Sequence, residues 1–240
     1  MKDDKNFYNN WKFYLGVFII LVAIGVAVSI PFIIKKDENS SDNSVATIVG
    51  KFIYGKGSEN IEDYEKDIKN SLDRWDKVLK YDEKIPIVFY TYSSNDSTLA
   101  FAYMNDENDI YGGGAVYINT YNRAETTMTE ILIHEIGHVL GIGTSSKWKK
   151  NTNGGVLNKN NFPKAYGYYK DWVEKNNKTL NESGIPLDVN KNHWSEEVFD
   201  TEMMTPISES AGVKLSLSKI TLGALEDLGW NIDYSKADNF

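Results

Sequence analysis

The residues best suited to chemistry are His134-Glu135-Ile136-Gly137-His138, in a chain of 240 residues with only three histidines. Residues four apart lie on one face of an α-helix, so the imidazoles of His134 and His138 can bind one metal ion together. Glu135 lies beside them without needing to bind the metal, where a general base for a metal-activated water belongs. A buried histidine with a purely structural role is the ordinary alternative. Ligand spacing with a glutamate inside it favours the metal site.

A catalytic zinc site needs three protein ligands and leaves a fourth position for water. Gly141 stands where the helix must end, since glycine accepts the positive φ that turns the chain beneath a metal. In the compact zinc-protease motif a third histidine comes three residues later, and here that position is Thr144. Either the third ligand lies elsewhere or the site is vestigial. His193 is the only histidine left, and Glu196 and Glu202 are the carboxylate alternatives.

Composition narrows the class of protein. Hydrophobic residues make up 41% of the chain and aromatic residues 13%, enough for a packed core. The net charge of −8 and the pI near 5.0 argue against a nucleic-acid partner, because phosphate binding needs a basic surface. The absence of cysteine excludes disulfides and thiolate zinc sites.

Residues 13–34 are 22 consecutive residues without a charge. As a helix they would extend about 33 Å, enough to cross a bilayer core of about 30 Å. A cleaved signal peptide is the alternative, with small residues at 27–29, but the run is longer than the usual signal core. We expect a short tail at 1–12, a single-pass signal anchor in the lipid bilayer at 13–34 and a polar linker at 35–46. Three lysines precede the run and two follow it, which weakly favours an extracellular or lumenal domain.

Residues 47–240 are expected to form one α+β domain. Apolar and β-branched runs predict strands at 47–54, 85–92, 98–104 and 115–119. Apolar residues at helical spacing predict helices at 58–80, 124–140, 164–175 and 216–229, the first capped by Ser58. Six apolar side chains should point into the core, namely Leu217, Ile220, Leu225, Leu228, Trp194 and Trp230. The acidic residues 106–109 indicate a solvated loop rather than a calcium site.

Three segments carry a more specific resemblance: HEIGHVLG at 134–141, HWSEEVFDTEMMTP at 193–206 and LGALEDLGW at 222–230. In their order they resemble the leishmanolysin family of zinc metallopeptidases, which are metzincins whose third histidine is displaced by an inserted segment. A fainter match is NFPKAYGYY at 161–169. The chain differs from several members in having no cysteine and no long pro-segment, and residues 188–192 replace a glycine-rich stretch.

The resemblance implies a metzincin-like fold, with a twisted mixed sheet, an active-site helix and a C-terminal subdomain that contains a methionine turn and a final helix. It makes residues 145–192 an insertion looped out of the active-site floor. It also implies one Zn²⁺ ion, with His134, His138 and His193 as its ligands. By the same resemblance Glu135 is the general base and Met204 is the turn methionine.

The implied activity is hydrolysis of peptide bonds by a membrane-anchored zinc endopeptidase. An extended peptide or protein substrate would pair with an exposed strand edge, for which Ala115, Val116 and Tyr117 are the candidates. One alternative is a non-catalytic surface or virion protein that retains the scaffold for adhesion or assembly. Another is a zinc hydrolase acting on small amides. The intact base and three histidines favour the endopeptidase.

Overall fold

The structure, a computed structural model, describes residues 46–122, 128–209 and 212–240. Within these ranges no helix combines the length and the apolar character needed to cross a bilayer. The predicted tail at 1–12, the anchor at 13–34 and all of the linker at 35–46 except Ala46 lie outside the described residues.

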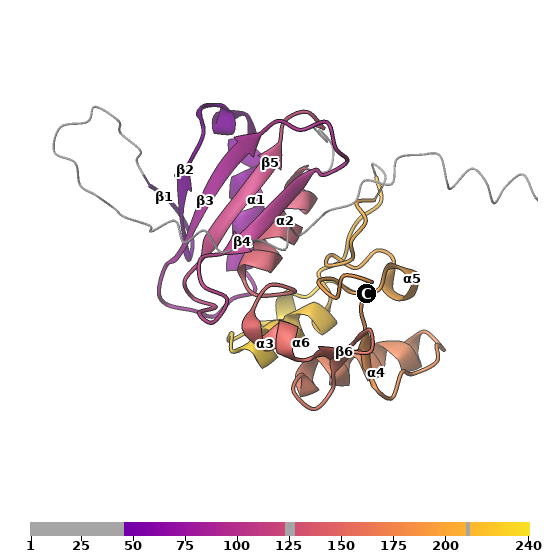
Figure 1. Cartoon of the computed structure of the whole chain (residues 1–240). Coiled ribbons are helices and arrows are strands. Elements are labelled where there is room, and N and C mark those ends of the chain that lie inside the picture. Colours follow the sequence, from indigo (N-terminus) through magenta and orange to yellow (C-terminus); the bar gives the residue numbers. More distant parts are fainter. Residues whose placement is uncertain (1–45, 123–127, 210–211) are drawn as a thin grey trace, which may run out of the picture.

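A five-stranded mixed sheet occupies the N-terminal half of the domain (Figure 1). Its order is β1-β2-β3-β5-β4, and the inner strands β2, β3 and β5 run parallel while β1 and β4 are antiparallel at the edges. The mixed sheet together with its helices confirms the predicted α+β class. The strands are β1 (Thr47–Val49), β2 (Phe52–Lys56), β3 (Ile85–Tyr92), β4 (Ala100–Met104) and β5 (Gly114–Asn119).

The place of β5 corrects the prediction of an exposed edge around Ala115, Val116 and Tyr117. Ala115 lies opposite Val88 of β3 on one side and opposite Tyr103 of β4 on the other. Both edges of β5 are therefore used inside the sheet, and no substrate can pair with it. The prediction was wrong because strand order depends on pairing between segments distant in the chain. The edge strand on this side is β4.

The predicted helix at 58–80 is two elements, a 3-10 helix η2 (Glu59–Tyr64) followed by α1 (Glu65–Asp76). Ser58 does not cap it, because the Ser58 hydroxyl accepts a hydrogen bond from the Thr91 backbone N–H at 3.0 Å instead. Trp75 joins α1 to the core, because it is fully buried and its indole N–H donates to the Ile133 carbonyl oxygen at 2.8 Å.

The histidine pair lies on α2 (Met128–Val139), which packs against α1, β4 and β5. Figure 1 shows this helix between the sheet and the C-terminal part of the chain. Every residue of α2 from Ile131 onward is buried. A helix that is covered on all sides has no solvent-facing stripe, so each polar group on it needs an internal partner.

The chain after α2 forms a second, mainly helical part. Its elements are α3 (Ser146–Lys150), a small antiparallel sheet of β6 (Thr152–Asn153), β7 (Val156–Asn158) and β8 (Gly184–Pro186), and then α4 (Pro163–Lys175), α5 (Glu196–Phe199), α6 (Lys219–Leu228) and η3 (Tyr234–Lys236). The six side chains expected to point inward from the last helix and its surroundings are all buried.

The insertion at 145–192 is not looped out, contrary to expectation. Trp148, from its first helix, is fully buried and its ring lies 5.1 Å from that of Trp194. Helix α4 packs on α6 at Gly223, where a β-carbon would lie 2.8 Å from the Ala165 backbone nitrogen. Aromatic side chains of the segment are buried in the core of the C-terminal part. This burial of apolar surface holds the segment against α6.

Candidate metal centre

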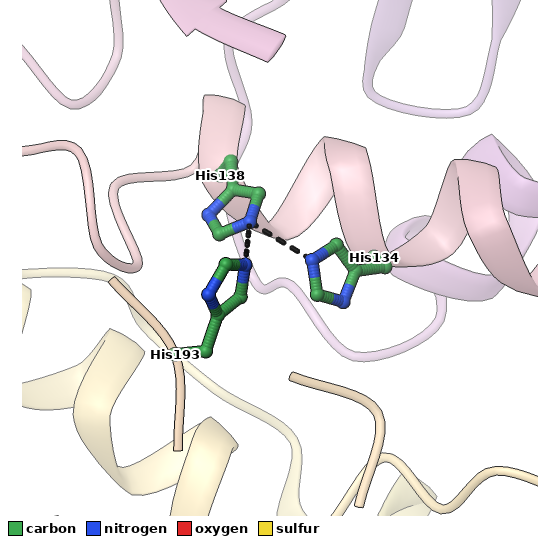
Figure 2. A group of neighbouring side chains, drawn as sticks. All are labelled: His134, His138 and His193. Atoms are coloured by element: carbon green, nitrogen blue, oxygen red, sulfur yellow. Dashed lines mark hydrogen bonds between the residues drawn. The ribbon is translucent and has the colours of Figure 1, made fainter. Parts of the chain in front are cut away.

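Three buried imidazoles from two distant segments meet at one point (Figure 2). His134 and His138 come from successive turns of α2, and His193 comes from the loop between β8 and α5. The Nε2 atom of His138 lies 2.9 Å from Nε2 of His134 and 3.1 Å from Nε2 of His193. None of the three side chains is more than 1% exposed. The structure thus brings together all three predicted ligands in a group that can hold a metal ion.

The hydrogen bonds behind the rings fix the tautomers of the helical pair. His134 Nδ1 lies 2.8 Å from the Met203 carbonyl oxygen, and His138 Nδ1 lies 2.8 Å from the Ile142 carbonyl oxygen. A carbonyl oxygen only accepts, so each Nδ1 must carry the proton and each Nε2 a lone pair. The Nε2 atoms of His134 and His138, which a dashed line joins in Figure 2, therefore turn lone pairs toward each other. A shared cation would stabilise that arrangement.

The third imidazole has a carboxylate behind it. His193 Nδ1 lies 3.4 Å from Oδ2 of Asp188, whose other oxygen accepts the backbone N–H groups of Asn192 and His193 at 3.0 and 3.1 Å. Burial raises the pKa of the Asp188 carboxyl, but its hydrogen bonds with His193 and the electrostatic attraction of that residue bring it below its usual value. Every imidazole of the group thus has an outer hydrogen-bond acceptor, the arrangement that orients metal-binding histidines.

The protonation state of the pair also suits metal binding. Burial, followed by repulsion from His193, lowers the pKa of His134 to about 3. Burial and the two neighbouring imidazoles hold the pKa of His138 well below its usual value. Both rings are therefore neutral at physiological pH, the form in which histidine binds a metal.

Glu135 is completely buried, and neither of its carboxylate oxygens has a hydrogen-bond partner in the structure. Burial raises the pKa of this carboxyl well above its usual value. An unpartnered buried carboxyl group lowers the stability of the fold, so its presence next to a group that can hold a metal ion points to function. A cation and a water molecule at the histidine group would supply the missing partners.

Two glycines bring His193 to the end of α2. Gly141 has a φ of +110°, as its predicted role in ending the helix requires. Gly143, which the sequence interpretation did not single out, has a φ of +74°, and a β-carbon there would lie 2.2 Å from the Asn192 carbonyl oxygen. Thr144 is not a ligand, since its hydroxyl donates to the His138 carbonyl oxygen.

Met204 is fully buried next to the histidine helix. The two carboxylates considered as alternative ligands both lie outside the histidine group. Glu202 accepts hydrogen bonds from residues of its own turn and of α6. Glu196 belongs to a separate acidic group with Asp200 and Glu209.

The aspartates of the acidic loop at 106–109 accept hydrogen bonds from backbone N–H groups two residues further along the chain. Asp106 Oδ1 accepts the Asn108 backbone N–H at 2.9 Å, and Asp109 Oδ1 accepts the Tyr111 backbone N–H at 3.0 Å. These bonds are typical of carboxylates that stabilise turns, in keeping with the solvated loop predicted from sequence.

Comparison with known proteins gives no match, either to a family model or to a curated protein sequence. A functional assignment for this chain therefore depends on the chemistry of its own residues.

Proposed function

We propose that the chain is a zinc-dependent endopeptidase. The observation that carries this proposal is the convergence of three Nε2 lone pairs beside Glu135, a buried carboxyl group with no partner. Tetrahedral zinc with imidazole ligands at 2.0–2.1 Å separates the nitrogens by about 3.3 Å. The separations of 2.9 and 3.1 Å are within a few tenths of an ångström of that value. A donor set of neutral imidazoles also suits zinc better than magnesium or calcium.

Glu135 is the proposed general base and acid. Zinc, when bound, would lower the pKa of a water molecule and polarise the substrate carbonyl. Glu135 takes the proton of the attacking water and delivers it to the leaving amine. Both of its oxygens are free for this, because no group in the described part of the chain is hydrogen-bonded to them. The raised pKa brings the carboxyl closer to the pH at which it must both accept and donate.

The edge strand β4 is the proposed support for an extended substrate. The Leu99 carbonyl oxygen accepts the Asn119 N–H of β5, and the Asn105 N–H donates to the carbonyl oxygen of Gly113, the residue before β5. Main-chain groups alternate in direction along an antiparallel strand, so those of Ala100, Ala102 and Met104 point away from β5. A peptide added at this edge would pair with them as a further strand. Helix α2, with the histidines, packs directly against β4.

The proposal agrees with the sequence resemblance to the leishmanolysin family and with the metzincin-like fold that this resemblance implies. We propose further that residues 13–34 anchor the domain in a bilayer, with the domain on the extracellular or lumenal side. A scaffold protein without activity is the alternative. The buried and unpartnered Glu135 argues against it, because this carboxyl group costs stability and a scaffold has no use for it.

Purified protein should degrade an unfolded protein substrate, lose this activity with a chelator and regain it when zinc is added. Elemental analysis should give one zinc per chain. His193→Ala should retain far less zinc, by more than the roughly 100-fold seen for residues that only support a ligand. Stoichiometric zinc without hydrolysis of any peptide or protein would establish the scaffold alternative instead.

A further inference from the structure

Glu202 is a fully buried carboxylate in the turn that leads to Met204. Its Oε1 accepts the Ser218 hydroxyl and the Thr221 hydroxyl, both at 2.6 Å, and the Ser218 backbone N–H at 3.2 Å. Its Oε2 accepts the Met204 backbone N–H at 2.6 Å. Burial raises the pKa of this carboxyl, and these four hydrogen bonds oppose the rise. Glu202 therefore joins the start of α6 to the turn.

The hydrogen bond to Met204 leads to the metal-binding group. The Met204 N–H belongs to the same peptide unit as the Met203 carbonyl, and that carbonyl accepts the Nδ1 proton of His134 at 2.8 Å. A carboxylate thus stands at one end of a peptide group and a candidate metal ligand at the other. Hydrogen bonding at the N–H end polarises a peptide and makes its oxygen a stronger acceptor.

We propose that Glu202 is a positioning residue of the metal site, acting on His134 through the Met203–Met204 peptide. This inference rests on the proposed metal-binding role of the three histidines. Glu202 fixes the orientation of the peptide, and its negative charge strengthens the bond that holds His134 in the tautomer with Nε2 free. Direct carboxylate partners of metal-bound histidines act in this way. Asp188 contacts His193 directly, whereas Glu202 reaches His134 through one peptide group.

Asp227 provides a matched control. It is a partly buried carboxylate in α6 that accepts the backbone N–H groups of Lys164 and Ala165 at 3.2 and 3.0 Å. It therefore joins two elements of the same part of the fold, as Glu202 does, but none of its hydrogen bonds leads to a histidine. A loss of general stability should affect Glu202→Gln and Asp227→Asn alike, whereas an effect through His134 should appear only in Glu202→Gln.

The test uses the full-length chain and measures zinc affinity by competition with a chromophoric chelator, with unfolding midpoints recorded alongside. We expect Glu202→Gln to bind zinc about 10–100-fold more weakly than wild type, the range for groups behind a ligand. Asp227→Asn should stay within about threefold. The visible absorption bands of the cobalt-loaded protein should shift in Glu202→Gln alone, because a change in ligand orientation alters the metal's electronic spectrum.

Ser218→Ala is a second variant in case Glu202→Gln does not fold. It removes one hydrogen bond to the carboxylate and the cap of α6, and it leaves the charge. It should weaken zinc binding in the same direction by a smaller factor. Unchanged affinity and unchanged cobalt bands in the folded variants would overturn the inference, as would equal weakening in Asp227→Asn. Wild type that binds zinc but hydrolyses nothing would overturn the endopeptidase proposal and leave this test intact.

Discussion

Gly137 and Met204 are in contact at the centre of the molecule, and a β-carbon on Gly137 would lie 2.6 Å from Sδ of Met204. Met204 is completely buried, so its side chain must repack against the surrounding core to make room for that carbon. Gly137→Ala should lower the free energy of unfolding by about 1–3 kcal/mol, the cost of overpacking a core. Chemical denaturation in the presence of chelator measures this effect separately from metal binding.

Gly167→Ala is the matched control for that substitution. Gly167 lies in α4, and a β-carbon there would meet nothing within 4 Å. Alanine is a better helix former than glycine, so this variant should gain about 0.5–1 kcal/mol. Stabilisation by both substitutions would show that Met204 can move away from Gly137 at little cost.

Glu135→Gln should separate hydrolysis from metal binding. Glutamine keeps the size of the side chain but cannot accept a proton at neutral pH, so peptide hydrolysis should fall by about 10²–10⁴-fold. Zinc content should remain at the wild-type value. The metal-free variant should be at least as stable as wild type, because Glu135 is buried without a partner. Retention of most of a chelator-sensitive activity would show that another group is the base.

The pH dependence of stability should report on His134. Burial lowers its pKa from 6.5 to about 3, so between these values the unfolded chain holds a proton there that the folded chain lacks. Stability of the metal-free protein is therefore lost as the pH falls below about 6.5. His134→Asn keeps an N–H group for the Met203 carbonyl but does not titrate. Between pH 6 and 4, wild type should lose up to about 1.4 kcal/mol more per pH unit than the variant. Parallel urea-unfolding curves would contradict this.

Met104→Pro tests the role of the β4 edge. The Met104 N–H points away from β5, so proline removes a donor to the substrate and keeps the pairing inside the sheet. Cleavage of extended peptides should weaken by about tenfold, the value of one net hydrogen bond of roughly 1.4 kcal/mol. Met104→Leu, which keeps the N–H, should behave as wild type. Equal activity of the two variants would place the substrate elsewhere.

The local elements of the fold could be predicted well from sequence. Strand Ile85–Tyr92 and helix Pro163–Lys175 were predicted to within one residue, because each has an apolar pattern of a single period with clear ends. The predicted strand at 47–54 is two strands, with a turn at Gly50 that has a φ of +53°. That prediction failed because only Gly50 and Lys51 separate the two apolar runs at 47–49 and 52–54, so the turn leaves a short interruption in the pattern.

The histidine group could be predicted, but the groups that support it could not. Histidine is rare in this chain, so His193 could be considered by elimination and by its resemblance to a family motif. Asp188 and the carbonyl groups of Met203 and Ile142 became visible only in three dimensions. Every residue has a backbone carbonyl, so residue type does not show which one will accept a hydrogen bond from a histidine. The sequence likewise does not show which of its many aspartates will contact His193. The sheet edge was missed for the same reason, since pairing is not local.

The position of His193 in the chain affects how a bound ion would stabilise the folded state. His138 and His193 are 55 residues apart, and an ion bound by both closes a loop of that length. In a chain without cysteine such an ion is a reversible cross-link, and a covalent cross-link of this span would stabilise a fold by about 4 kcal/mol. The free energy of unfolding would then increase with the free concentration of the ion. At one hundred times the dissociation constant the increase would be about 2.7 kcal/mol. Metal supply would then set how much of the protein stays folded.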